Sequence, residues 1–231
     1  MYPNHHHCFL RVAASSNNFL QLTSSAGAPT HTLGSGVLVH SGTGGQGGTI
    51  QLFRPLINQG TISADVSGKT IAINQAGPLT NSGTLQATGG GILSVDPTTW
   101  TNSGTLVTNT GGQINITGNL DNTGATFTLT PTSANVHLGS GGVISGGTIT
   151  STGGASLIID AGTLSGVTLD TDLIVPNAVT MGIQNGLTFA NNHKITVAST
   201  GSNTILQLAG SVNQTIGGTG EIVFGGTASN D

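Results

Sequence analysis

Residues 79–105 read LTNSGTLQATGGGILSVDPTTWTNSGT, and this stretch decides the fold. The phrase Asn-x-Gly-Thr occurs in it twice, at Asn81 and again at Asn102. Intact or varied, the phrase begins at five positions that lie 23, 21, 20 and 23 residues apart: Asn58, Asn81, Asn102, Asn122 and Ser145. A period near twenty, with strand-forming residues between the anchors, is typical of a solenoid of stacked β-strands.

The residues around each anchor repeat as well. A glycine-rich turn follows the anchor, and after it apolar residues alternate with polar ones, which predicts a strand with one face turned inward. These alternating pairs are Ile71/Ile73, Leu93/Val95, Ile114/Ile116, Val136/Leu138 and Leu157/Ile159. Two residues before each of the four anchor asparagines lies a large apolar residue that we assign to the core: Leu56, Leu79, Trp100 and Leu120. The alternative for Trp100, a platform for sugar stacking, is disfavoured because the aligned positions are leucines.

Three short inward-facing patches per repeat predict an all-β fold, a single-stranded parallel β-helix of about 20–23 residues per coil without significant helix. Equivalent residues of successive coils then stack at the strand spacing of about 4.8 Å. Asn carries two donors and one acceptor and tolerates tight corners, so we predict a structural ladder of stacked amides. Its members are Asn58, Asn81, Asn102 and Asn122. A row of ligand-binding amides is the competing interpretation.

The organisation along the chain is uneven. Residues 30–231 are predicted to form one β-helix domain, with regular coils over about 46–160 and irregular coils over 161–231. Residues 1–29 differ in texture, include three consecutive histidines at 5–7, and are interpreted as a foreign, truncated or poorly ordered leader. They contain no recognisable signal peptide. We expect the chain to be a piece of a longer protein.

Composition excludes several functions. The 231 residues include only 4 basic and 8 acidic residues, which is too few cations for a nucleic-acid surface or a basic membrane-surface helix. No apolar stretch is long enough to insert into a membrane. Cys8 is the single cysteine, so an intrachain disulfide and a cysteine metal cluster are both excluded. The remaining histidines His31, His40, His137 and His193 lack a ligand spacing, and we expect no cofactor and no metal.

The runs Thr80–Leu93 and Thr101–Ile116, and the later run Gly162–Leu173, carry a family resemblance. They are similar to the repeats of filamentous-haemagglutinin-type proteins and of autotransporter passengers, large bacterial surface proteins. The likeness covers roughly residues 30–225. It implies a right-handed parallel β-helix, export across the bacterial envelope, a secreted or cell-surface location, and a role in adhesion.

The leading hypothesis is therefore a non-enzymatic structural or adhesive segment that acts as a rigid display rod. Its partners would be a glycan or a host or matrix protein, and its open strand edges predict end-to-end self-association. Loops within 131–142 or 190–203 would offer the contact surface. A third hypothesis is an ice-binding or phage-fibre solenoid. The row of threonines at the anchors supports it, although Ala125 interrupts this row.

The enzymatic alternative is a carbohydrate-active β-helix, a polysaccharide lyase or a glycoside hydrolase. It would need carboxylates close together on one exposed face. The candidates are Asp170 and Asp172, which form an Asp-x-Asp pair, together with Asp160. Solvated corner aspartates are the simpler interpretation, so we lean against an enzyme. Convergence of the three carboxylates within about 10 Å would favour the enzyme, and their scatter would disfavour it.

Overall fold

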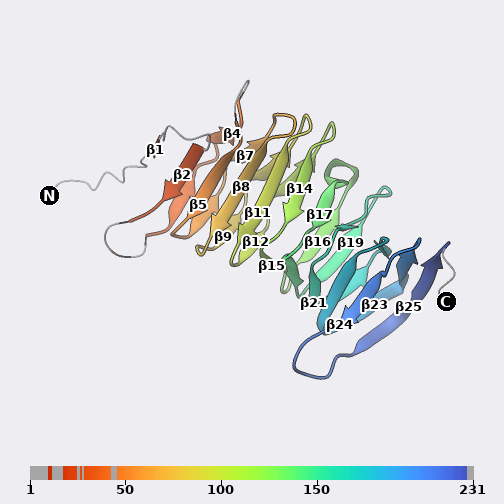
Figure 1. Cartoon of the computed structure of the whole chain (residues 1–231). Coiled ribbons are helices and arrows are strands. Elements are labelled where there is room, and N and C mark those ends of the chain that lie inside the picture. Colours follow the sequence, from red (N-terminus) through yellow and green to blue (C-terminus); the bar gives the residue numbers. More distant parts are fainter. Residues whose placement is uncertain (1–9, 12–17, 25–26, 28, 43–45, 228–231) are drawn as a thin grey trace.

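The chain forms an all-β solenoid of about 8 turns. The computed structural model describes residues 10–11, 18–24, 27, 29–42 and 46–227. Figure 1 shows the strands stacked side by side along one axis, with β2 near one end of the stack and β25 at the other. Within the described residues the single helical element is the short 3-10 turn η1 (Pro131–Ser133). The predicted all-β parallel solenoid is confirmed.

Each regular turn has three sides, which we number in the order in which the chain follows them. Side 1 holds β1 (Leu10–Arg11), β2 (Asn18–Leu22), β5 (Gly48–Leu52), β8 (Thr70–Gln75), β11 (Ile92–Pro97), β14 (Gln113–Ile116), β17 (Val136–Leu138) and β20 (Ile158–Ile159). Side 2 holds β3 (His31–Leu33), β6 (Leu56–Asn58), β9 (Leu79–Asn81), β12 (Trp100–Asn102), β15 (Asn119–Asp121) and β18 (Val143–Ser145). Side 3 holds β4 (Leu38–His40), β7 (Thr61–Ala64), β10 (Thr84–Ala87) and β13 (Thr105–Thr108), and beyond them β16 (Thr126–Leu129) and β19 (Thr148–Ser151). All pairs are parallel except β1 with β2.

The core follows from the alternation in the sequence. In β11, Leu93 and Val95 are buried while Ser94 between them is partly exposed. These two residues lie in register with Ile71 and Ile73 of the preceding turn. Because every turn repeats this register, the inward residues stack into continuous apolar rows. Such rows give a rod a core without disulfides or metals.

The Asn-x-Gly-Thr phrase forms the corner between sides 2 and 3. The backbone N–H groups of Ser82 and Gly83 both donate to the carbonyl oxygen of Asn58 in the turn below, at 2.8 and 2.9 Å. A Cβ on Gly83 would overlap the carbonyl oxygen of Gly60. At Gly60, Gly83 and Gly104 the second position after the anchor is therefore glycine because the backbones of adjacent turns approach too closely for a side chain. At Gly124 the space is open, and the positive φ of 71° favours glycine instead.

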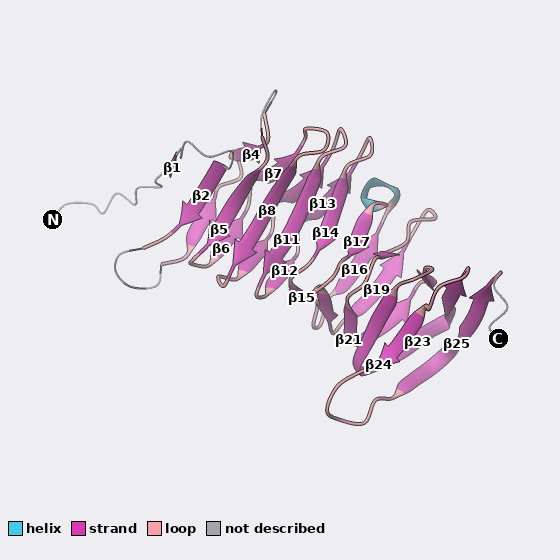
Figure 2. Cartoon of the chain, in the orientation of Figure 1, coloured by secondary structure: helices cyan, strands magenta, loops and turns pink. Residues whose placement is uncertain are grey.

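This corner changes at Asn122, and side 3 is interrupted there. The N–H of Thr123 donates to its neighbour Asp121 at 3.0 Å, and Ala125 closes a local turn onto Asn122 O at 3.0 Å. Side 2 pairs β12 with β15 through one residue pair, where the preceding turn has three. On side 3, β13 ends one sheet and β16 begins another. Figure 2 shows η1 at the same level of the stack, in cyan.

The later turns keep the three sides but join their strands. β21 (Thr163–Asp170) covers sides 2 and 3 in one strand, with a register shift between Ser165 and Val167. β22 (Leu173–Val175), β23 (Thr180–Ser199), β24 (Ile205–Leu208) and β25 (Ile216–Gly226) complete the stack. The prediction of a loop within 190–203 is wrong for residues 190–199, which belong to β23. This strand turns its corner at the bulge of Asn191 and Asn192 and stays paired within the sheet.

The first two strands, β1 and β2, lie within residues 1–29, the segment that we interpret from the sequence as a leader. β2 pairs in parallel with β5, from Asn18 with Gly48 to Leu22 with Leu52, so the sheet of side 1 begins before residue 30. The rest of the expected leader, residues 1–9, 12–17, 25, 26 and 28, lies outside the described residues, and with it the three histidines and Cys8. In the portion of the chain that the structure describes, no helix has the length and apolar character needed to cross a membrane.

Candidate functional site

The predicted amide row lies inside the corner between sides 2 and 3. Asn58 Nδ2 donates to Asn81 Oδ1 at 2.7 Å, and Asn81 Nδ2 donates to Asn102 Oδ1 at 2.6 Å. Asn58 and Asn81 are fully buried. Asn122 is also buried, but its amide donates to backbone oxygens of Ala125, Gly146 and Thr148, at 3.2–3.4 Å. Three amides thus form a ladder, and the fourth serves the next corner.

The four apolar residues before these asparagines lie directly above one another. Leu56 pairs with Leu79, Leu79 with Trp100, and Trp100 with Leu120. All four side chains are buried in the core. Trp100 presents no face to solvent on which a sugar could stack.

Two of the three candidate carboxylates come together at the corner between sides 3 and 1 of the later turns. His193 lies between them: its Nδ1 is 2.9 Å from Asp172 Oδ1, and its Nε2 is 3.6 Å from Asp170 Oδ1. Asn191 Nδ2 donates to Asp170 Oδ1 at 2.6 Å, and the N–H of Lys194 donates to Asp172 Oδ1 at 3.1 Å. The left-handed backbone at Asn191, φ 52°, makes the bulge that positions these groups.

The third carboxylate belongs to a different cluster. Asp160 Oδ2 is 2.7 Å from His137 Nδ1, and the other ring nitrogen of His137 is 2.9 Å from Asn135 Oδ1. Ser156 Oγ lies 3.5 Å from the carbonyl oxygen of Asp172, which places Asp172 beside Ser156. Four residues of extended chain separate Ser156 from Asp160, or about 13 Å. Asp160 therefore lies at the opposite end of side 1 from Asp172.

This geometry limits the chemistry at the cluster of Asp170, Asp172 and His193. A general base needs a free ring nitrogen directed at the substrate. Here one nitrogen of His193 contacts Asp172 and the other faces Asp170. The three-carboxylate arrangement of the enzymatic hypothesis does not form, and the groups present clamp two successive turns together.

The contact with His193 has a measurable electrostatic consequence. The hydrogen bond from the His193 side chain lowers the pKa of Asp172 below its ordinary 3.8, the N–H of Lys194 adds to the effect, and partial burial opposes it. A lowered carboxyl pKa stabilises the fold above pH 3.8, and this contribution is lost as the pH falls through the folded-state pKa. We expect an NMR titration to find the Asp172 pKa below 3.8, and His193→Ala to return it toward that value. His137→Ala, which removes the partner of Asp160, is the control; an Asp172 pKa that does not respond to His193→Ala contradicts the assignment.

Sequence reasoning missed that three histidines each contact an aspartate of an adjacent turn. The pairs are His40 with Asp65, His137 with Asp160, and His193 with Asp172. Their separations are 25, 23 and 21 residues, so the coil period itself is the signal that would have found them. Among the described residues, no group of three or more His, Cys, Asp or Glu side chains is arranged to hold a metal ion.

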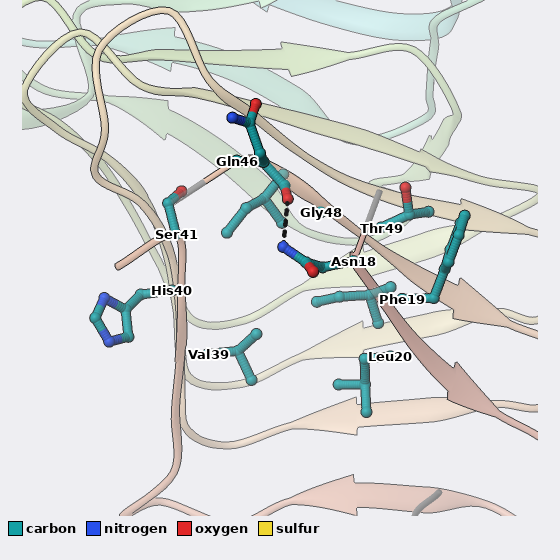
Figure 3. Close-up of a pocket in the computed structure, with 12 residues that line it drawn as sticks. Asn18, Phe19, Leu20, Val39, His40, Ser41, Gln46, Gly48 and Thr49 are labelled. Carbon is teal, nitrogen blue, oxygen red and sulfur yellow. Dashed lines mark hydrogen bonds between the residues drawn. The ribbon is translucent and has the colours of Figure 1, made fainter. Parts of the chain in front are cut away.

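A small cavity lies near the start of the stack, between β2, β4 and β5 (Figure 3). Its volume is about 180 Å³, and Leu20, Val39 and Ile50 form its apolar floor. The polar side chain of Asn18 also lines it and donates to Gly47 O at 3.3 Å. The cavity joins the end of the apolar core and holds no convergent set of ionisable groups.

Comparison of the chain with protein-family models, with curated proteins and with solved structures gives no match.

Proposed function

We propose that the chain is a structural and adhesive segment of an exported bacterial surface protein, in which it acts as a rigid display rod. The observation that carries the proposal is the continuous inward row on side 1. Seven residues stack in register from Leu20 to Ile159, and Val175, Val197 and Phe224 stack in register with one another in the later turns of the same side. About 8 turns at a spacing of ~4.8 Å give a rod roughly 40 Å long. The residues that resemble surface-protein repeats support the location.

The row supports a mechanical role because its side chains are buried from Ile50 to Val197. Stacked Val, Ile and Leu, parallel hydrogen bonding and the amide ladder all act between neighbouring turns, so bending the rod would break several contacts at once. A spacer needs this property, whereas it needs no cleft.

The test of this function is a binding screen of the full chain against glycans and matrix proteins, with reducing-sugar release measured in parallel. We expect retention on at least one glycan or matrix protein and no release of sugar. Release that disappears in the variant Asp170→Ala plus Asp172→Ala would overturn the proposal in favour of a carbohydrate-active enzyme. If the same double variant folds normally but no longer binds, the adhesive surface lies at Asp170 and Asp172.

The rod also offers a surface for end-to-end association. Phe224 continues the row of Val175 and Val197, which are buried, yet it is 85% exposed. Ile222 beside it is exposed as well. We infer that the face of β25 stacks against another coil of the same type.

Replacing Phe224 by lysine should therefore weaken concentration-dependent self-association by about tenfold, since burying a Phe side chain is worth about 1.5–3 kcal/mol. Sedimentation velocity over a range of protein concentrations measures the effect. Phe53→Lys is the matched control, because Phe53 is 46% exposed but lies at a lateral corner after β5. Equal association of both variants and the parent chain would refute the stacking.

A further inference from the structure

The interruption of side 3 leaves two strand edges facing each other across a slot. β13 is the last strand of one sheet and β16 the first strand of the next. The slot between them has a volume of about 390 Å³. Its walls are the corner and start of β13, the strand β16, and the turn η1, whose side chains close one end. Figure 2 shows η1 beside this interruption.

The edges carry backbone groups that regular turns would pair. In parallel strands, alternate residues point both their N–H and their C=O to the same neighbour. The N–H groups of Thr105 and Asn109 donate backward to Gly83 O and Ala87 O, so the groups of Leu106 between them point forward, into the slot.

The opposite edge is complementary. The carbonyls of Ala125 and Leu129 accept from Thr148 and Thr152 of the following turn. By the same alternation, the backbone groups of Thr126 and Thr128 point back into the slot. In the regular turns the residue equivalent to Thr126 donates to the corner glycine below, as Thr105 does to Gly83 at 2.8 Å; within the described residues that bond is missing between Thr126 and Gly104.

The slot also opens slightly onto the core. Leu106 is 7% and Phe127 is 5% exposed, whereas the equivalent inward residues Leu85 and Ile149 are 0% exposed. A strand that entered here would therefore cover apolar surface as well as satisfy backbone groups. The neighbouring side chains are threonines, serines and an asparagine, and none of the residues that line the slot is charged.

We propose that this slot binds an extended, uncharged peptide segment of a partner protein, which adds a parallel strand between β13 and β16. Recognition by strand addition depends on main-chain hydrogen bonds for affinity and on side-chain fit for specificity. Here both edges supply main-chain groups, the floor of Leu106 and Phe127 favours one small apolar side chain, and the neutral walls disfavour a charged one. The proposal is independent of the display-rod function.

The first test uses a capped hexapeptide with the sequence of residues 83–88, Gly-Thr-Leu-Gln-Ala-Thr, which is the strand that already pairs with β13 from its other side. Isothermal titration of the full chain should detect its binding. The same peptide with N-methyl groups on alternate residues loses three N–H donors and should bind about a hundredfold more weakly, since each lost backbone hydrogen bond costs about 1 kcal/mol. Equal affinities, or no binding of either peptide, would overturn the proposal.

The second test locates the site. Thr128→Trp places bulk at the slot, and Thr150→Trp makes the same change at the position in register one turn further on, outside it. We expect Thr128→Trp to weaken peptide binding about tenfold and Thr150→Trp to leave it within about twofold. Residue-resolved hydrogen exchange gives a readout in folded protein: the peptide should protect the amides of Leu106, Thr126 and Thr128 and leave Leu85 unchanged. Protection elsewhere, with these three unaffected, would refute the site.

Discussion

Replacing Trp100 by alanine should lower the free energy of unfolding by about 3–5 kcal/mol, the largest stability loss that we expect from a single side-chain truncation in this chain. Trp100 is 1% exposed and stacks in register between Leu79 and Leu120. The cavity left by the alanine cannot be closed by a movement of the neighbouring turns, because the turns above and below are already in contact. The loss should therefore be near the upper end for aromatic truncation.

A leucine at this position is the matched control. Trp100→Leu restores the residue found at the aligned positions and removes the indole Nε1, a buried donor without a hydrogen-bond partner. We expect it to cost about 1–2 kcal/mol, because the smaller cavity is partly offset by the loss of an unsatisfied donor. Urea unfolding followed by far-UV circular dichroism measures both variants, since the chain has no second tryptophan to report by fluorescence. Equal losses for alanine and leucine would show that Trp100 does not fill a row of the core.

The regular half of the fold was predictable because one structural cause acts on every turn. The corner needs glycine wherever the backbones of adjacent turns approach closely, as at Gly83 and Gly104. Because this requirement recurs once per turn, glycine recurs in the sequence with the period of the coil. The apolar pairs then follow from the two-residue repeat of a strand. The pairing register of the strands is fixed as well, since a shift by one residue would turn the inward-facing apolar residues toward solvent.

The interruption at β16 was not predictable from spacing. Asn122 follows Asn102 by 20 residues, which is the normal period, and Gly124 occupies the usual position. The difference lies inside the corner: Gly124 has φ 71°, and Asp121 takes the N–H of Thr123 that would otherwise bond to the turn below. The inward residue Phe127 then lies five residues after its anchor, where Leu106 lies four after its own. The side chain of Asp121, next to the corner, changes the hydrogen bonding there. The spacing of the anchor residues does not reveal this change.

The candidate site was only partly predictable for a related reason. The Asp-x-Asp spacing brings Asp170 and Asp172 to one corner, but the clamp is completed by His193 from the following turn. Asp160 is ten residues from Asp170 in sequence, yet the chain turns corners between them, so nearness in sequence does not become nearness in space. In a solenoid, proximity is set by the coil period, and partners have to be sought one full turn away.

Removing the middle amide of the ladder should have the second largest effect. Asn81→Ala takes away the acceptor of Asn58 Nδ2, in a buried bond, and the donor to Asn102 Oδ1, in a partly buried one. Each buried polar group that loses its partner costs about 1–3 kcal/mol, so we expect a loss of about 2–4 kcal/mol in the free energy of unfolding. Urea unfolding of the variant and the parent chain, at the same pH, gives the difference.

The end of the ladder supplies the control for this prediction. Asn102→Ala removes the acceptor of Asn81 Nδ2 and a weak donor to Gly104 O at 3.4 Å. Asn81 Nδ2 keeps a weak contact with Gly83 O at 3.4 Å. It should cost about half as much as Asn81→Ala, or about 1–2 kcal/mol. The double variant Asn58→Ala plus Asn81→Ala should lose less than the sum of its single variants, by about 1 kcal/mol, because the two amides share one hydrogen bond. Additive losses of equal size at all three positions would mean that the amides act as isolated corner residues, and the ladder would then have no cooperative role in holding the turns together.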